Sequence, residues 1–140
     1  MNIILFGPPG SGKGTQADKI VKNFNLHKVS TGDLLREEIE KKTDLGMKIK
    51  SEIDKGLLIS DDIITGIIVK ILSNKKSIDN LIFDGYPRNL NQAKSLSTLI
   101  KKHNQKISCV FNLKVDKEII IKRISGRQIC TKCESIFNEF

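Results

Sequence analysis

The sequence of 140 residues contains no tryptophan, one tyrosine, three cysteines and only four arginines. No apolar run reaches the roughly 18 residues that a membrane span requires. The start, MNIILFGPPG, lacks the basic region and the long apolar run of a signal peptide. In a reducing compartment three cysteines do not build a disulfide framework. We therefore expect a cytoplasmic protein that has no membrane segment and no disulfide scaffold.

The chain is strongly basic, with a formal net charge of +8 and a pI near 9.5. Such values suggest a nucleic-acid partner. However, 20 of the 24 basic residues are lysines, which are scattered beside acidic residues without forming a basic block. We interpret them as a solvated surface and expect no nucleic-acid partner. The arginines stand out because their planar guanidinium binds phosphate bidentately; they are Arg36, Arg88, Arg123 and Arg127.

Strand and helix patterns alternate along the chain. Apolar runs predict strands at 2–6, 28–30, 81–84 and 109–113, and 3.6-residue periodicity predicts helices at 13–24, 31–42, 44–55, from Ser60 or Asp61 onward, at 90–102 and at 116–125. In the first helix Ala17, Ile20, Val21 and Phe24 form the predicted apolar stripe. This alternation predicts an α/β fold, with a parallel sheet covered by helices on both faces.

A glycine-rich segment follows the first predicted strand and opens the first helix. Its glycines allow backbone amides to form a concave anion site at a helix N-terminus. Lys13 would place a positive charge on the β- and γ-phosphates, and the Thr15 hydroxyl would lie near a metal ion. The alternative is a turn that only connects two elements. The predicted phosphate ligands are Gly10, Ser11, Gly12, Lys13, Gly14 and Thr15.

Two further motifs, Ser30-Thr-Gly-Asp-Leu-Leu-Arg36 and Asp84-Gly-Tyr-Pro-Arg88 with Gln92, follow Gly7-Pro-Pro-Gly-Ser-Gly-Lys-Gly-Thr-Gln16. With these three motifs the chain resembles the adenylate kinase family over essentially its whole length. The resemblance implies a Mg²⁺-dependent reaction, ATP + AMP ⇌ 2 ADP, and a phosphate-loop three-layer fold. It implies three domains: a core at 1–29 and 60–125, a helical AMP-binding insertion at 30–59, and the start of a lid at 126–140.

The resemblance also implies an AMP site. Its residues would be Thr31, Arg36, Leu57, Leu58, Ile59, Gly85, Tyr86, Pro87, Arg88 and Gln92. The chemistry fits, because two arginines suit an α-phosphate and the Gln92 amide can both donate to and accept from an adenine edge. For Thr31 a helix-capping role is the alternative.

Five residues are predicted to carry the chemistry: Lys13, Asp84, Arg88, Arg123 and Arg127. Asp84 ends an apolar strand, where a carboxylate organises Mg²⁺ through water; the alternative is a turn-forming Asp before Gly85. Asp33 is a second candidate for that role. Arg123 and Arg127 are predicted to share one helical face at i, i+4 spacing. The resemblance places both near the transferring phosphates, Arg127 at the lid hinge, and the alternative is a solvated surface pair.

The last feature is Cys130-Thr-Lys-Cys133. The pair does not open a thioredoxin-like unit, whereas its spacing fits half of a tetrahedral zinc site. The resemblance implies a lid with structural Zn²⁺ whose second ligand pair lies beyond Phe140, and it places Ile136 and Phe137 at the ATP site. We therefore expect a chain truncated at its C-terminus, with zinc bound tightly only in the intact protein.

Two alternative functions remain at this point. A pyrimidine monophosphate kinase would use the same phosphate loop, but Gln92, Thr31 and the cysteine pair favour AMP as the acceptor. A nucleotide- or RNA-binding protein without phosphoryl transfer would account for the positive charge. We expect a monomer whose small-molecule partners are ATP, AMP and ADP.

Overall fold

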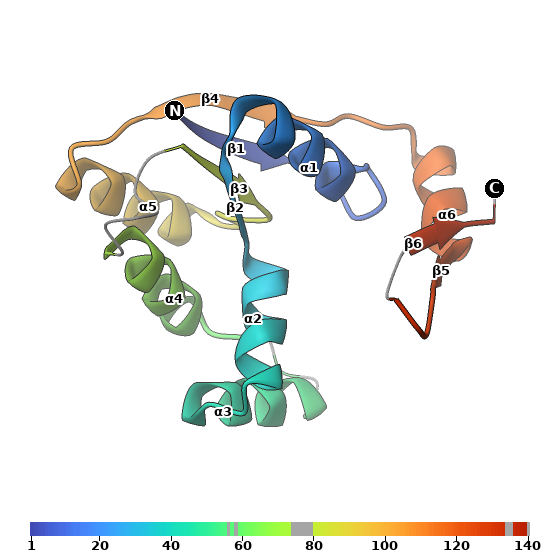
Figure 1. Ribbon diagram of the computed structural model, residues 1–140, viewed down its shortest axis with the longest axis horizontal. Coiled ribbons are helices and arrows are strands. Elements are labelled where there is room, and N and C mark those ends of the chain that lie inside the picture. Colours follow the sequence, from blue (N-terminus) through green and yellow to red (C-terminus); the bar gives the residue numbers. More distant parts are fainter. Residues whose placement is uncertain (56, 58, 74–79, 134–135, 140) are drawn as a thin grey trace.

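The computed structural model describes residues 1–55, 57, 59–73, 80–133 and 136–139, without the side chains of Ile129 and Ile136. Within these ranges four strands form a parallel sheet in the order β2-β3-β1-β4 (Figure 1). The strands are β1 (Asn2–Phe6), β2 (His27–Ser30), β3 (Leu81–Asp84) and β4 (Ile107–Asn112). The predicted α/β class with a parallel sheet is confirmed.

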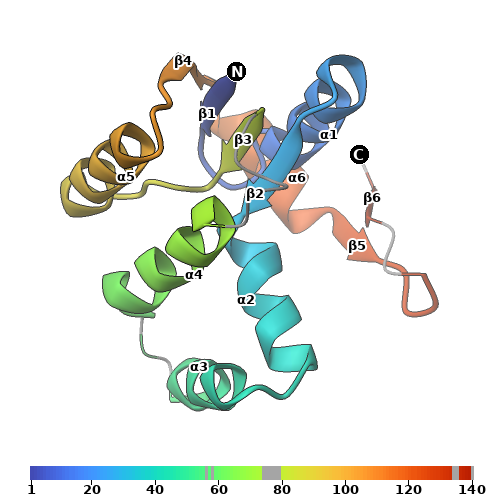
Figure 2. The ribbon, with the colours of Figure 1, turned by 60° about the vertical axis from the view of Figure 1, so that its left-hand side comes forward.

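Helices cover both faces of the sheet, as the views in Figures 1 and 2 show. Their bounds are α1 (Lys13–Phe24), α2 (Thr31–Glu40), α3 (Asp44–Asp54), α4 (Asp61–Ser73), α5 (Leu90–Lys102) and α6 (Lys117–Ser125). On one face α4 and α5 bury a cluster that includes Ile68 and Leu96 against Phe83. On the other face α1 packs Ala17 against Ile3 and Leu5. The sheet is therefore the middle of three layers.

The predicted boundaries lie within two residues of the observed ones, and α2 ends at Glu40, two residues before its predicted end. The fourth strand begins at Ile107, two residues before the prediction, because its N-terminal end pairs with Asn2 of β1. Phe24, expected in the apolar stripe of α1, is 61% exposed. Phe24 is the last residue of α1, and the C-cap Asn25 takes a left-handed conformation that ends the helix.

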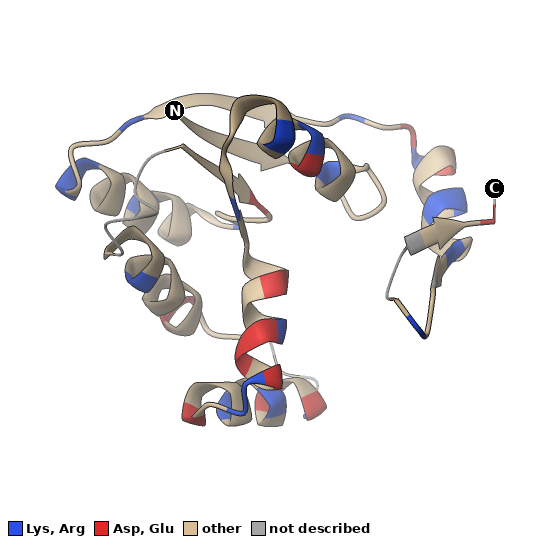
Figure 3. Ribbon diagram, viewed as in Figure 1, with Lys and Arg blue, Asp and Glu red and all other residues tan. Residues whose placement is uncertain are grey.

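Two segments extend from the three layers. Helices α2 and α3 project from the carboxyl end of β2, and α6 leads to an antiparallel hairpin of β5 (Arg127–Ile129) and β6 (Ile136–Asn138) (Figure 1). Lysines and arginines are spread over the helices beside acidic residues, and α2 is rich in acidic side chains (Figure 3). Among the residues that the structure describes, no helix has the length and apolar character to cross a bilayer.

The turn between α2 and α3 depends on Gly46, whose added Cβ would overlap the carbonyl of Glu38. We expect Gly46→Ala to lower the free energy of unfolding by about 2 kcal/mol, because backbone must move to admit the methyl group. Gly66 in α4 is the matched control, since a Cβ there meets nothing within 4 Å. Gly66→Ala should raise stability by about 0.5–1 kcal/mol. Urea denaturation of both variants measures the contrast, and equal shifts would contradict it.

Candidate active site

The phosphate loop connects the buried central strand β1 to α1. Gly7 and Gly12 adopt φ angles of 154° and 89°, in the region that favours glycine. A Cβ at Gly7 would lie 2.6 Å from the Ser11 hydroxyl oxygen. Gly12 is the N-cap of α1 and makes no side-chain cap hydrogen bond. The first amides of α1 therefore remain available to an anion.

Lys13 bends back across this loop. Its Nζ donates to the carbonyl oxygens of Gly7, at 2.6 Å, and Pro8, at 3.0 Å. In the same loop, the Ser11 hydroxyl is, among the described side-chain nitrogen and oxygen atoms, the one that is buried without a hydrogen-bond partner. A buried hydroxyl without a partner costs about 1–3 kcal/mol, so its place in a loop of anion-binding geometry points to a ligand oxygen as its partner.

Removal of this hydroxyl should have opposite effects on stability and on binding. We expect Ser11→Ala to raise the free energy of unfolding of the nucleotide-free protein by about 1 kcal/mol and to weaken ATP binding about fivefold. Thermal unfolding and calorimetric titration measure the two effects. Ser97→Ala, on the exposed side of α5, should leave ATP affinity unchanged. A destabilised Ser11→Ala protein with undiminished affinity for ATP would refute this role.

A cleft of about 380 Å³ joins the phosphate loop to the segment after β3. The two segments lie together because β1 and β3 are adjacent parallel strands in which Leu5 pairs with Asp84, so that the carboxyl ends of the strands meet. Its volume is in the range of small-molecule sites. The lining residues are Leu5, Phe6, Gly7, Pro9, Lys13, Gly85, Pro87 and Arg88.

Asp84 ends β3 beside the start of α1. Its Oδ2 lies 4.0 Å from the position that a Cβ on Gly14 would occupy. Partial burial raises the pKa of the Asp84 carboxyl, while the nearby charges of Lys28 and Lys13 oppose that rise. The structure places this carboxylate next to the start of α1, at the end of the phosphate loop.

Thr31 and Arg88 meet on the other side of the cleft. The Thr31 hydroxyl donates to the Gly85 carbonyl at 3.2 Å and accepts from Arg88 Nη2 at 3.4 Å. Arg88 Nε donates to the same carbonyl at 2.9 Å. The helix cap is instead Ser30, whose hydroxyl accepts from the Asp33 N–H. The capping alternative for Thr31 is therefore wrong, because α2 begins at Thr31 itself, one residue earlier than a Thr31 cap would require.

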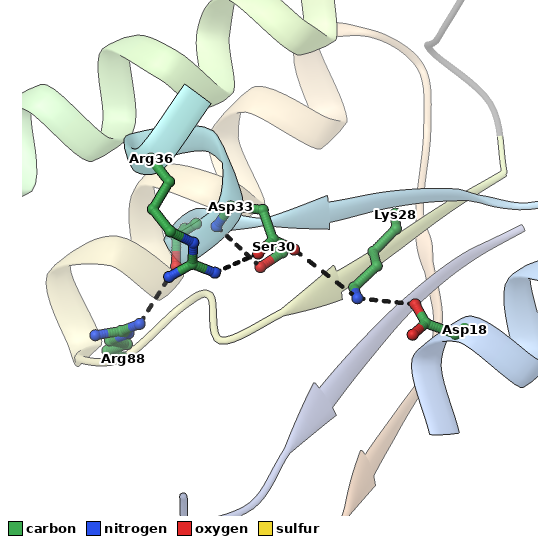
Figure 4. A network of polar contacts seen from close by, with 7 residues as sticks. Asp18, Lys28, Ser30, Asp33, Arg36 and Arg88 are labelled. Carbon is green, nitrogen blue, oxygen red and sulfur yellow. Dashed lines mark hydrogen bonds and ion pairs between the residues drawn. The ribbon is translucent and has the colours of Figure 1, made fainter. Parts of the chain in front are cut away.

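An ion-pair network at the start of α2 was not predicted (Figure 4). Lys28 on β2 lies 2.8 Å from Asp18 of α1 and 3.9 Å from Asp33, which also pairs with Arg36. Partial burial works against the charged form of Lys28, but the hydrogen bond and charge of Asp18 outweigh it and raise the pKa of Lys28. Burial likewise opposes ionisation of Asp33, yet hydrogen bonds from Ser30 and Arg36 lower its pKa. Nothing in the sequence distinguishes Lys28 from the other lysines.

The remaining predicted acceptor residues differ in burial. Tyr86 is fully buried, and its ring packs near that of Phe83, so its side chain is not available to a ligand. Burial raises the pKa of its hydroxyl. Leu57 is 58% exposed and Ile59 is partly buried against the core. Leu58 lies outside the described residues.

Gln92 is 3% exposed and its amide has two partners. Its Oε1 accepts from the Arg88 backbone N–H at 2.7 Å, and its Nε2 donates to Asp61 Oδ1 at 2.6 Å. Asp61, at the start of α4, was named in the sequence analysis only as a possible beginning of that helix. The spacing of 31 residues between Asp61 and Gln92 gave no sign of this contact.

Arg123 lies at the phosphate loop, where its Nη1 donates to the Gly10 carbonyl at 3.4 Å. The prediction that Arg127 lies on the same helical face as Arg123 is wrong. Helix α6 ends at Ser125 with Gly126 as C-cap, and Arg127 begins β5. The i, i+4 relation requires a continuous helix, and the glycine interrupts it.

The cysteine pair lies in the connection between β5 and β6. Cys130 is partly buried and Cys133 is exposed. Phe137 on β6 is 58% exposed, and the side chain of Ile136 lies outside the described part. Among the described residues no three His, Cys, Asp or Glu side chains gather as a metal site.

The fold and the loop define a phosphate-loop nucleotide-binding protein of the α/β class. Comparison with known proteins narrows this class, because the adenylate kinase family profile matches residues 5–139. The chain belongs to the adenylate kinase family. It is 51% identical over 140 residues to the adenylate kinase of Pelagibacter ubique, 47% over 138 to that of Mycoplasma mycoides and 41% over 139 to that of Enterococcus faecalis. These alignments cover 99–100% of this chain but 64–66% of the relatives' lengths.

Proposed function

We propose that this protein transfers a phosphoryl group between ATP and AMP with formation of two ADP. The observation that carries the proposal is that Lys13 of the phosphate loop and Arg88 line the same cleft. A phosphoryl group moving between two nucleotides needs positive charge around both phosphate chains and an in-line arrangement. The relatives are adenylate kinases by name, which supports the same activity.

Different residues would bind the two nucleotides. The amides of the loop, the Ser11 hydroxyl and Lys13 would hold the phosphates of ATP, with Gly14 and Thr15 at the start of α1. Arg88 and Arg36 would hold the AMP phosphate, and Thr31 fixes the orientation of the Arg88 guanidinium. Arg123 is held at the loop through Gly10, where its charge would stabilise the equatorial oxygens. No general base is required, because positioning and charge account for the transfer.

Magnesium fits this arrangement through its ligand chemistry. Mg²⁺ prefers oxygen ligands, keeps several waters and is bound through one or two carboxylates together with substrate phosphates. The half-buried Asp84 carboxylate beside Gly14 offers such a ligand, with Asp33 as a second candidate. The ion would neutralise charge on the phosphate oxygens.

We further propose a division of the chain into a core at 1–29 and 60–125, an AMP-binding insertion at 30–59 and the start of a lid from 126. The projection of α2 and α3 and the separate β5–β6 hairpin support these limits. Cys130 and Cys133, placed together between the two strands of the hairpin, suit half of a structural zinc site in the lid. Arg127, Ile136 and Phe137 would approach ATP from this lid. Cytoplasmic location and a monomeric state complete the proposal.

The direct test is an acceptor comparison. ATP with Mg²⁺ is supplied as the donor, and AMP, CMP, UMP and GMP are offered in separate coupled assays of ADP formation. The proposal predicts a clear preference for AMP. A preference for a pyrimidine monophosphate would overturn the acceptor assignment. Nucleotide binding without acceptor-dependent ADP formation would overturn the activity.

A further inference from the structure

The buried amide of Gln92 is held by partners from two elements. The carboxylate of Asp61, in the first turn of α4, accepts from Gln92 Nε2 at 2.6 Å. The backbone N–H of Arg88 donates to Gln92 Oε1 at 2.7 Å. Asn89 in turn holds the carboxylate, because its Nδ2 donates to Asp61 Oδ1 and Oδ2 at 3.1 and 2.9 Å. The Asn89 Oδ1 accepts from the Gln92 N–H at 2.8 Å as the N-cap of α5.

These partners fix which end of the Gln92 amide is oxygen and which is nitrogen. A carboxylate is an acceptor only, so it must face the NH₂ group. A backbone N–H is a donor only, so it must face the carbonyl oxygen. A flipped amide would place oxygen against oxygen and N–H against N–H. Because Gln92 is 3% exposed, water cannot readily compensate for these two lost bonds.

A fixed amide can distinguish two kinds of purine. Each end keeps one bonding position, a second hydrogen on Nε2 and a second lone pair on Oε1. Oε1 can accept from the 6-amino group of adenine while Nε2 donates to the ring nitrogen N1, a bidentate contact like those by which Gln recognises adenine in nucleic acids. A 6-oxopurine presents the O6 acceptor where adenine presents the amino donor, and an N1–H donor where adenine presents the N1 acceptor. An amide that is free to flip could match this reversed pattern of donor and acceptor, whereas an amide held in one orientation cannot.

We propose that Asp61 is a positioning residue that makes the acceptor site selective for 6-aminopurine over 6-oxopurine monophosphates, by fixing the orientation of the Gln92 amide. The inference rests on the proposed function, since it assigns the base of AMP to Gln92. Asp61 itself does not contact the nucleotide. It acts through Gln92, so its replacement should alter the ratio between two acceptors more than the activity with either one.

The test compares AMP with inosine monophosphate, the 6-oxo analogue. In Asp61→Asn the new amide can donate or accept, so one of the two constraints on Gln92 is removed and only the Arg88 N–H still opposes the flipped orientation. We expect the ratio of kcat/KM for AMP to that for inosine monophosphate to fall about tenfold or more, which corresponds to the lower part of the 1–3 kcal/mol that a bidentate base contact contributes. Asp62→Asn is the matched control. It removes the same charge from the exposed neighbouring position in the same helical turn, and its ratio should equal that of the wild type.

The possible outcomes distinguish a failure of this inference from a failure of the proposed function. A folded Asp61→Asn protein with the wild-type ratio would overturn this inference alone. A wild-type protein that uses neither acceptor would overturn the proposed function, and this inference with it. A second measurement does not depend on the variant's folding: in the nucleotide-free wild type, the side-chain amide protons of Gln92 should exchange with solvent far more slowly than those of the exposed Gln16. Equal exchange rates would also overturn the inference.

Discussion

Replacing Lys13 with alanine is expected to lower the rate of ADP formation by about a thousandfold, because preorganised positive charge on the transferring group carries most of such a reaction. Lys13 Nζ lies over the phosphate loop, 2.6 Å from the Gly7 carbonyl oxygen and 3.0 Å from that of Pro8. A bound phosphate would offer the ammonium a charged partner in place of these carbonyls. Steady-state assays with saturating ATP and AMP measure the loss.

The same variant should keep its fold. The contacts of Lys13 are with two loop carbonyls, one of them exposed, so its loss should change the free energy of unfolding by no more than about 1 kcal/mol. Lys19→Ala, at an exposed position of the same helix, is the control and should leave turnover unchanged. Wild-type turnover in Lys13→Ala would remove this residue from the site.

The second large effect is expected at Arg88. Arg88→Lys should lower kcat/KM for AMP about 100-fold, because a lysine keeps the charge but loses the planar fork. In the structure this fork is oriented by Arg88 Nε, which donates to Gly85, and by Nη2, which donates to the Thr31 hydroxyl. A lysine ammonium cannot make these two contacts and still present two parallel donors to a phosphate.

The effect should be confined to the acceptor. Because the loop that would hold ATP does not include Arg88, the equilibrium affinity for ATP in the absence of AMP should remain within about twofold of the wild type, which is within 0.5 kcal/mol. Calorimetric titration with ATP alone checks this expectation. An equal loss of affinity for both nucleotides would show that Arg88 serves the whole cleft, contrary to the proposed division of roles.

Features that depend on local sequence could be predicted before the structure. The phosphate loop is one, because the glycines, Lys13 and the strand before them lie within fifteen residues and fix the geometry together. The ends of the strands are another, since Asp84 closes an apolar run that only a buried strand explains. The helix at 90–102 was predicted with its observed bounds, because its apolar periodicity is a local property of the sequence.

Features that depend on distant partners could not be predicted. The contact between Gln92 and Asp61 spans 31 residues and joins two helices, and the network around Lys28 joins β2 to α1 and α2. The prediction for Arg127 failed for a local reason. Its spacing from Arg123 fitted a helix, but Gly126 ends that helix. The prediction used only the spacing of the two arginines and did not take into account that the glycine between them ends the helix.

The central claim is that one cleft holds two nucleotides, the phosphates of one at the glycine loop and those of the other at Arg88 and Arg36. A crystal structure with a bisubstrate analogue, two adenosines joined through their phosphates, tests it most directly. The account predicts phosphate oxygens against the loop amides and Lys13, with the second adenine against Gln92. An analogue in which either adenosine half lay outside this cleft would contradict the account.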